Sequence, residues 1–530
     1  MDGLPCEILE HVYCFLNFCD YLRATEVCCL WKNIFASKIS RNGNLIISYH
    51  MLKARNKSLY TIFELFSKNS RIYQNIVFEG IDFLSFDRKT EIQFKVFLAN
   101  VGWNSKFLIL QDCILTTFEL CQICKLMKEL EFLEISSCRI HYNVMLVPDL
   151  KLNFTTLKLI NIRNLKTENE EIIDLLTEGN SAVIELIIND SYIDDRTKIM
   201  LSMKRLKRLS CTFYQSVSVQ NILSRPEVVL HSLQLQRKPS DLLHPDIISN
   251  IIQNQCNLRE FCINTPLTAE LLTEISRNLV YLEKLSITIH DSISPVCSTT
   301  TWPNLRVLQM SCRTMHFIDV ILNSMIFEKL TELQLYTERF SKNTMKIIYA
   351  KCSGLKTLTL SALSMMRCQE TLGTIGCKLL NIETIDIHCS SQTDFAAFLK
   401  SAETLRHLRS LHLFYCEKIT DHTIASICMP YLSSFKLSHN RQISSVGLQE
   451  MFVKCFRIKH LTLRGCPGVN DGVIKMMVEK LPDLEHLDVS ESSEITLNSI
   501  RYIITGLRCL TQPLSHETSY QMPLQYQGTP

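Results

Sequence analysis

Apolar residues return in a fixed short pattern along most of this chain. The pattern is Leu-x-x-Leu-x-Leu, and its copies follow one another at intervals of about 25 residues. Such an interval leaves room for one strand, one turn and one helix, so the strands would stack into a parallel sheet. We place the central aliphatic position of each copy at Leu108, Leu133, Leu157, Leu186, Leu209, Leu233, Phe261, Leu285, Leu308, Leu333, Leu358, Ile385, Leu411, Phe435, Leu461 and Leu487. The pattern predicts an α/β solenoid of horseshoe shape.

Residues between the inward leucines would point to the opposite, concave face, because side chains alternate along a strand. Near the start of the array these positions are apolar, whereas in its middle they are mostly Ser, Thr and Gln. The apolar set consists of Phe107, Ile109, Phe132, Ile160 and Ile187. We expect it either to bind another molecule or to be covered by a loop or by the N-terminal segment.

Near the end of the array the concave positions become basic and aromatic. They are His388, His412, Phe414, Lys436, His460, Arg464 and His486, opposed by Asp386 and Asp488. Neighbouring strands lie about 4.8 Å apart, so these residues are expected to form one column of hydrogen-bond donors around Phe414. An acidic or phosphorylated segment of a target would suit such a patch. The alternative is an ordinary solvated sheet face with an excess of histidine.

A different apolar pattern, with helical spacing, precedes the repeats. Pro5 stands where a first helical turn tolerates proline, and Asp20 is placed to cap a second helix that carries Trp31. One face of the first helix would carry Ile8, Leu9, Val12, Phe15 and Leu16. Two or three helices within about forty residues bury too little apolar surface to be stable alone. Part of this face is therefore expected to pack on a partner or on the next repeat.

This segment resembles the F-box signature, in register and without a gap. The matching residues are Leu4, Pro5, Glu7, Ile8, Leu9, Leu16, Asp20, Val27, Cys28 and Trp31. Tyr21 departs from the leucine that the family favours, and Cys29 and Leu30 stand where basic residues are common. The resemblance implies binding to the Skp adaptor of an SCF-type ubiquitin ligase, which is joined to a cullin and a RING subunit. The implied adaptor-binding residues are Leu4, Pro5, Ile8, Leu9, Val12 and Leu16, with Trp31 fixing the helix packing. The alternative is a helical cap on the solenoid.

The last repeats resemble the cysteine-containing class of leucine-rich repeats, which commonly accompanies an F-box. Cys416 and Cys466 follow their strands, and Thr420-Asp421 and Asn470-Asp471 stand where this class caps the next helix. The two resemblances divide the chain into an F-box at 1–42 and leucine-rich repeats at 105–510. Residues 43–104 match poorly and are expected to be a connector with irregular first repeats, including a further strand at Ile76 and Phe78. Residues 511–530 would form a C-terminal tail.

Composition and charge narrow the function further. The chain is 46% hydrophobic and 21% charged, which is typical of a folded protein, and its formal net charge of +3 gives no broad grip on nucleic acid. Acidic residues near the N-terminus argue against a signal peptide, and no apolar run reaches the roughly 18 residues that a membrane span requires. We expect no membrane association, and a place in the cytosol or nucleus.

The cysteines and glycines do not suggest catalysis. In a reducing compartment the 23 cysteines would be free thiols, and Cys113, Cys138, Cys416 and Cys466 recur at one core position of the repeat. The pair Cys121 and Cys124 lacks a second pair at zinc spacing, and no phosphate-binding glycine loop is present. We predict neither metal nor cofactor. The predicted function is a non-catalytic substrate receptor of a ubiquitin ligase that directs an unknown protein target to the proteasome; the alternative is an interaction scaffold or inhibitor without ligase association.

Overall fold

The computed structural model describes most of the repeat array in two compact units. Unit 1 comprises residues 1–267 and 274–286, and unit 2 comprises residues 268–273 and 287–530. The described residues are 44–54, 58–68, 73–141, 156–167, 182–189, 203–213, 229–237, 244–289, 298–313, 315–365, 369–389, 394–416, 418–492 and 494–507. The whole F-box segment at 1–42 therefore lies outside the described residues. None of the described helices is long and apolar enough to cross a membrane.

Unit 1 is built on a parallel sheet in which the order β1-β2-β3-β5-β7-β9-β10-β11-β12 follows the chain. Its elements are β1 (Asn44–Ser48), α4 (Tyr49–Ala54), α5 (Leu59–Ser67), β2 (Asn75–Glu79), η2 (Phe83–Ser85), α6 (Arg88–Val101), η3 (Gly102–Asn104), β3 (Phe107–Gln111), β4 (Ile114–Thr116), α7 (Thr117–Leu126), β5 (Phe132–Ser136), β6 (Arg139–His141), β7 (Leu159–Arg163), β8 (Lys166–Thr167), β9 (Glu185–Asn189), β10 (Arg208–Phe213), β11 (Ser232–Arg237), α10 (Pro245–Asn254) and β12 (Glu260–Leu267). The short strands β4, β6 and β8 form a second parallel sheet. The division between the units falls within α11 (Ala269–Asn278) and β13 (Lys284–Ile289).

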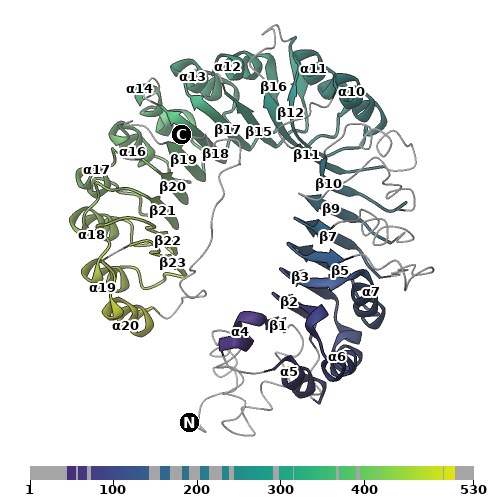
Figure 1. Ribbon diagram of the computed structural model, residues 1–530. Helices are drawn as coiled ribbons and strands as arrows, with labels where there is room; N and C mark the ends of the chain where they lie inside the picture. The colour runs from purple at the N-terminus through teal and green to yellow at the C-terminus, as the bar shows by residue number, and fades with distance from the viewer. Residues whose placement is uncertain are drawn as a thin grey trace. The chain divides into compact units, whose positions relative to one another are not determined.

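Unit 2 repeats the same strand-and-helix plan, with the parallel order β15-β17-β18-β19-β20-β21-β22-β23. Its elements are β14 (Thr300–Trp302), β15 (Val307–Cys312), α12 (Met315–Ser324), β16 (Met325–Phe327), β17 (Glu332–Arg339), α13 (Lys342–Lys351), β18 (Thr357–Ser364), α14 (Gln369–Leu372), α15 (Ile375–Lys378), β19 (Thr384–Cys389), α16 (Ala396–Ala402), β20 (Ser410–Phe414), α17 (Asp421–Ala425), β21 (Ser434–Ser438), α18 (Ser445–Lys454), β22 (His460–Thr462), α19 (Asp471–Lys480), β23 (His486–Asp488) and α20 (Leu497–Gly506). Within this unit the helices lie on one side of the strands and leave the other face of the sheet uncovered by helices (Figure 1).

The predicted core positions pair with one another in the sheet register. In unit 2 the buried row contains Leu308, Leu333, Leu358, Ile385, Leu411, Phe435, Leu461 and Leu487. In unit 1 the row passes from Leu133 to Ile160 and on to Leu186. Leu157 was therefore the wrong anchor, because the isoleucine three residues later occupies the strand position. Ile160 is fully buried, so its predicted place on the concave face is also wrong. The α/β solenoid with a parallel sheet is confirmed.

Aromatic packing forms the core of the segment that matched the repeat poorly. Ile76 and Phe78 lie in β2, and Ile76 pairs with Leu108 of β3. Behind the strand, the Phe63 ring centroid lies 5.0 Å from that of Phe94 and 5.2 Å from that of Phe97. Phenylalanine takes the place of leucine in this core, which explains the weak pattern at these residues.

Polar groups connect one repeat to the next on the helical side of unit 2. Asp471 Oδ1 accepts a hydrogen bond from the Thr496 backbone N at 2.9 Å, and Asp421 Oδ1 accepts one from Ser444 N at 2.7 Å. Each aspartate thus holds the first turn of the following repeat's helix. Asn470 caps its own helix through Val473 N at 3.0 Å. Thr420 makes no side-chain bond to the backbone of its helix, so the expected cap is present in one repeat and absent in the other.

Candidate functional site

The predicted target-binding residues of unit 2 lie on one face of the sheet in three neighbouring rows, not in the single column expected. The rows differ because the residues occupy the first, third and fifth positions of their strands. The first row contains Ser410, Ser434, His460 and His486; the second contains Asp386, His412, Lys436, Thr462 and Asp488; the third contains His388, Phe414 and Ser438. Arg464 lies two residues beyond the end of β22, outside all three rows.

His388 and Phe414 form a stacked aromatic pair in the third row. Their ring centroids are 4.2 Å apart with an interplanar angle of 15°. Burial lowers the pKa of His388 below its usual range, the Asp386 carboxylate opposes this change, and the neighbouring His412 adds to it. The imidazole is therefore expected to be neutral near pH 7, and it contributes a flat aromatic surface and not a cation.

His412 is held by polar groups on both sides of its ring. Its Nδ1 lies 2.6 Å from Asp386 Oδ1, and its Nε2 lies 3.0 Å from Ser434 Oγ. The side chains of His412 and Asp386 are only 14% and 24% exposed, so solvent screens this pair weakly. Thr359 Oγ1 is 3.4 Å from the second Asp386 oxygen. This cluster fixes the ring orientation, and an incoming ligand would have to compete with Asp386 for it.

His460 and His486 form the exposed end of the first row. Their ring centroids are 6.3 Å apart, and His460 Nε2 lies 4.0 Å from Glu485 Oε2. Burial lowers the pKa of His486, and the positive field of His460 and Lys436 acts in the same direction while Asp488 opposes it. The His486 imidazole is therefore expected to be neutral near pH 7.

Arg464 is engaged in a turn beside the sheet face. Its Nε donates to Glu491 Oε1 at 3.0 Å, and its Nη2 also bonds this oxygen. The bond with Arg464 lowers the pKa of Glu491. We expected Arg464 to offer its donors to a target, but in this structure a carboxylate of the chain already occupies them. Glu491 was missed because it follows its strand by three residues, outside the alternation that identifies face residues.

The turns after the last strands align to form a short polar and aromatic row. Tyr415, His439, Gly465 and Glu491 all have positive φ, from 55° to 62°. The Tyr415 and His439 rings stack at 4.8 Å, and His439 Nδ1 lies 3.8 Å from Glu491 Oε2. A Cβ on Gly465 would come within 2.8 Å of His439 Nδ1, so the glycine makes room for that ring. This row borders the sheet face where the strands end.

The apolar set of unit 1 is smaller than predicted. Phe107 is 37% exposed, and its ring centroid lies 5.4 Å from that of Phe132 on the next strand. Ile109 and Ile187 are half-buried on the same face, while Ile160 belongs to the core. The exposed apolar surface is therefore centred on the two phenylalanines at the beginning of the array.

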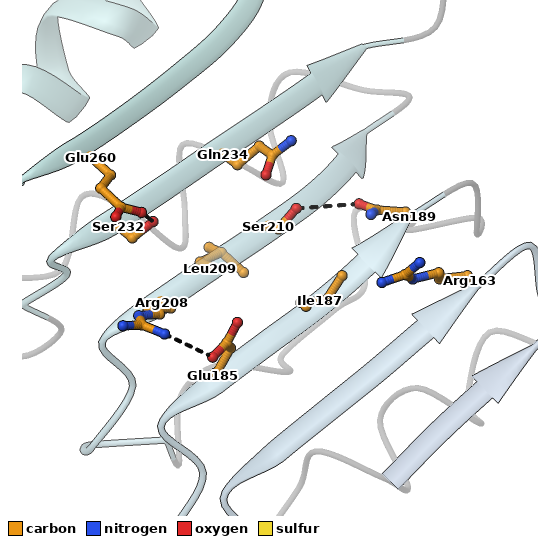
Figure 2. Close-up of a pocket in the computed structure, with 10 residues that line it drawn as sticks. All are labelled: Arg163, Glu185, Ile187, Asn189, Arg208, Leu209, Ser210, Ser232, Gln234 and Glu260. Carbon is orange, nitrogen blue, oxygen red and sulfur yellow. Dashed lines mark hydrogen bonds and ion pairs between the residues drawn. The ribbon is translucent and has the colours of Figure 1, made fainter. Parts of the chain in front are cut away.

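A polar hollow of about 320 Å³ lies on the sheet face of unit 1 (Figure 2). Figure 2 shows Arg163 and Asn189 toward the ends of their strands, and Glu185 and Glu260 toward the strand starts, with Ile187 between them. The lining residues are Arg163, Glu185, Ile187, Asn189, Arg208, Leu209, Ser210, Ser232, Gln234 and Glu260.

Most charges in this hollow are matched within the chain. Arg208 lies 3.3 Å from Glu185, and Ser232 Oγ donates to Glu260 at 2.8 Å. Arg163 Nε donates to Asn161 Oδ1 at 3.0 Å, and the two Nη groups of the same guanidinium lie at the hollow. The hollow offers amide, hydroxyl and guanidinium groups without a net charge, which suits the backbone of a polar peptide. The repeat pattern predicted the Ser and Gln positions and Ile187 on this face, but not the charged residues beside them.

Models of two known families each match a segment of the chain. A model of the F-box domain matches residues 1–42, and a model of the Leucine Rich repeat matches residues 404–428. The chain therefore carries an F-box domain at its N-terminus and a leucine-rich repeat, the combination found in F-box and leucine-rich-repeat proteins. The crystal structure of the Rad7 and Elc1 complex in yeast is similar at 18% sequence identity, covering 58% of this chain and 82% of that chain with a TM-score of 0.33. Domains of these two kinds are typically non-catalytic interaction modules, and F-box domains generally bind Skp-type adaptors.

The predicted adaptor-binding residues of this chain fall within the matched segment 1–42. They are Leu4, Pro5, Ile8, Leu9, Val12, Leu16 and Trp31, and all lie outside the described residues. Their role in adaptor binding stays a prediction.

Most cysteines of the described repeats pack as core residues, whereas Cys256, Cys377 and Cys428 are exposed. Cys138 Sγ donates to the Leu110 carbonyl at 3.3 Å, and Cys466 Sγ donates to the Leu437 carbonyl at 3.8 Å. Cys121 and Cys124 are both buried in α7, and burial raises the pKa of Cys121 to about 11. Among the residues that the structure describes, no group of three or more His, Cys, Asp or Glu side chains is arranged to hold a metal ion.

Proposed function

We propose that this protein is the substrate-recognition subunit of an SCF-type ubiquitin ligase. Its F-box docks on the Skp adaptor, which links it to a cullin-RING core, and its leucine-rich repeats hold a target protein for ubiquitination and proteasomal degradation. The chain itself performs no chemistry in this proposal; it brings the target close to the ubiquitin-charged enzyme. It acts in the cytosol or nucleus.

The observation that carries the proposal is the presence of an F-box at one end of a long repeat array. The F-box match covers 42 residues, which is enough for a docking element but too small for an enzyme. A repeat array presents an extended surface, the usual requirement for binding a macromolecule. The combination therefore supports a protein that joins two partners.

The sheet face of unit 2 is the surface that we assign to the target. It combines the flat pair His388 and Phe414 with basic groups at Lys436 and His460 on neighbouring rows and at Arg464 in the turn beside them. Aromatic groups beside cations suit a segment that carries a phosphate or carboxylate next to an apolar side chain. The neutral polar hollow of unit 1 would accept only less charged segments.

Adaptor binding is the direct test of the ligase role. We expect the full-length chain to co-purify with the Skp adaptor and cullin, and the double variant Leu4→Ala with Pro5→Ala to lose them. Two docking side chains at a small interface contribute several kcal/mol together, on the order of a hundredfold or more in affinity. The matched control is Glu10→Ala with His11→Ala, which changes two residues of the same segment outside the signature.

The alternative function is an interaction scaffold or inhibitor without ligase association. It is favoured if the wild-type chain captures no adaptor, or if both double variants capture it equally well. Circular dichroism of each variant separates loss of docking from loss of folding. Capture of proteins by a chain lacking residues 1–42 would then identify targets that are bound but not degraded.

A further inference from the structure

A row of charged residues runs along the edge of unit 2 where the strands begin. Backbone hydrogen bonds of 2.8 Å join the row, from Glu383 N to Lys356 O and onward in the same way through the next repeats. In order, the row contains Lys356, Glu383, Arg409, Ser433, Lys459 and Glu485. Adjacent repeats thus bring successive side chains of the row close together.

Cations of this row usually pair with an acid of the neighbouring repeat. Lys356 Nζ lies 2.7 Å from Glu383, and Lys459 Nζ lies 2.7 Å from Glu485. The corresponding row of unit 1 shows the same arrangement, with Lys106 and Lys158 at 2.8 Å and 2.7 Å from the two oxygens of Glu131. Neutralised pairs are therefore common along this edge, although Lys207 in unit 1 bonds the Val229 carbonyl instead.

Among the described residues, no such pair forms at the two repeats between Glu383 and Lys459. Arg409 has Glu383 on one side, which is bonded to Lys356, and Ser433 on the other. Its Nη1 instead donates to the carbonyls of Arg406 at 2.9 Å and Leu408 at 3.2 Å. In the described part of unit 2, no ion pair joins Arg409, Arg406 or Arg457 to a carboxylate, although Arg409 and His407 help to lower the pKa of Glu383.

Two of these guanidinium groups lie close to an exposed tyrosine. Tyr431 is 49% exposed and lies in the loop between those of Arg409 and Arg457. The guanidinium carbons of Arg409 and Arg457 are 5.5 Å and 5.7 Å from the Tyr431 ring centroid. Phe456, also 49% exposed, lies 5.8 Å from the same Arg457 carbon. Tyr431 thus has a cation from each neighbouring repeat within about 6 Å of its ring, and an anion bound beside the ring would be attracted by both.

We propose that this edge patch, defined as Arg406, His407, Arg409, Tyr431, Phe456 and Arg457, binds an acidic segment of a partner protein. Two guanidinium forks provide bidentate donors for carboxylates, and the exposed rings of Tyr431 and Phe456 accept an apolar side chain from the same segment. The patch lies at the edge of the sheet, apart from the three rows of the face. It requires no ligase association, so it goes beyond the proposed function.

The small size and acidic borders of the patch favour an acidic peptide over nucleic acid. The patch spans three adjacent repeats, or roughly 10–15 Å at the usual strand spacing. Glu383 lies on one border, and Asp483 and Glu485 lie on the other. A nucleic acid strand that continued past either border would meet these acids, whereas a short acidic segment would end before them.

The test uses the full-length chain and a fluorescein-labelled synthetic peptide of alternating Glu and Gly residues with one central Phe. We expect saturable binding by fluorescence anisotropy that weakens with salt. Arg409→Gln with Arg457→Gln should weaken it by roughly tenfold for each guanidinium removed, because a hydrogen bond to a charged group contributes strongly. The same peptide with Gln in place of Glu should not bind.

The matched control is Lys106→Gln with Lys158→Gln, which removes the same charge from the paired row of unit 1. It should bind the peptide like the wild type. Arg457→Gln alone is the second variant. Among the described residues the Arg457 side chain makes no hydrogen bond to its own loop, so this substitution should not disturb the fold. The variant should retain the wild-type circular dichroism and bind the peptide less tightly.

Three results with the peptide would overturn the proposal. They are absence of saturable binding to the wild type, equal binding by the wild type and the double arginine variant, and equal loss in the lysine control. Tighter binding of an oligothymidylate of the same length, lost in the arginine variant, would assign the patch to nucleic acid instead and would also refute the proposal.

Discussion

Asn440 offers a sharp test of how the repeats of unit 2 hold together. The residue follows β21 and is fully buried, although its side chain is polar. Its Nδ2 donates to the Cys416 carbonyl of the preceding repeat at 2.8 Å, and its Oδ1 accepts from the Gln442 backbone N at 3.0 Å. Asn440→Ala removes both bonds at once. The substitution should therefore loosen the contact between two repeats without touching the sheet face.

The size of the effect follows from what remains after the substitution. The Cys416 carbonyl keeps a second partner, the Ile419 N–H at 3.1 Å, so it is not left unsatisfied. Gln442 is exposed, and water can reach its backbone amide. Neither group carries the full cost of an unpaired buried group, so each lost bond should cost about 1 kcal/mol, with a small further cost for the cavity. We expect Asn440→Ala to lower the unfolding free energy by about 2–3 kcal/mol.

Hydrogen exchange read by mass spectrometry is the suitable assay, since repeat proteins can open locally. Peptides that cover Cys416 and Asn440 should exchange faster in the variant, while peptides from unit 1 should not change. Asn381→Ala, at an exposed position before β19, is the control and should match the wild type. A urea-derived loss below about 0.5 kcal/mol, or uniform acceleration in both units, would show that these bonds do not couple the two repeats.

Two further outcomes are expected from the sheet face. Because burial lowers the pKa of His388, the unfolded chain binds a proton at a pH where the folded chain does not. The unfolding free energy should therefore fall as the pH drops below about 6.5, the usual histidine pKa. His388→Phe should reduce this fall while keeping the stack on Phe414. Urea titrations at several pH values check this, and an unchanged pH dependence would mean that His388 is not the responsible group. Lys436→Glu with Arg464→Glu should abolish capture of the targets that are identified with the chain lacking residues 1–42. The control Lys475→Glu with Lys480→Glu, an equal charge reversal on α19, should still capture them. Unaltered capture by the first variant would exclude this face as the target site.

The strand positions were largely predictable because burial on one face constrains them strongly. Each strand must place aliphatic residues in the shared core, and a shift by one residue would expose all of them. The error at Leu157 arose where two aliphatic triplets follow each other directly, Leu157 with Leu159 and Ile160 with Ile162. Both fit the repeat pattern, and only the pairing of Ile160 with Leu133 decides between them. Pattern alone cannot make that choice, because leucine and isoleucine are equally suited to the core.

The composition of the sheet face was also predictable, but its internal pairing was not. Alternation identified His412 and Arg464 as outward residues without saying which carboxylates reach them. His412 meets Asp386 on the adjacent strand, in the same row. Arg464 meets Glu491, which is 27 residues later and lies in a turn with positive φ. Turn geometry and side-chain reach decide the second pair, and neither follows from the hydrophobic period.

These internal pairs determine what kind of target the sheet face would select. A carboxylate ligand that approached Arg464 or His412 would replace Glu491 or Asp386, so one ion pair would be exchanged for another with little net gain. A phosphate carries nearly two negative charges and three acceptor oxygens, so it can displace a single carboxylate and also reach a neighbouring donor. We therefore expect this face to discriminate in favour of phosphorylated segments. The arginines of the edge patch form no ion pair with a described carboxylate of unit 2, so they can bind ordinary carboxylates.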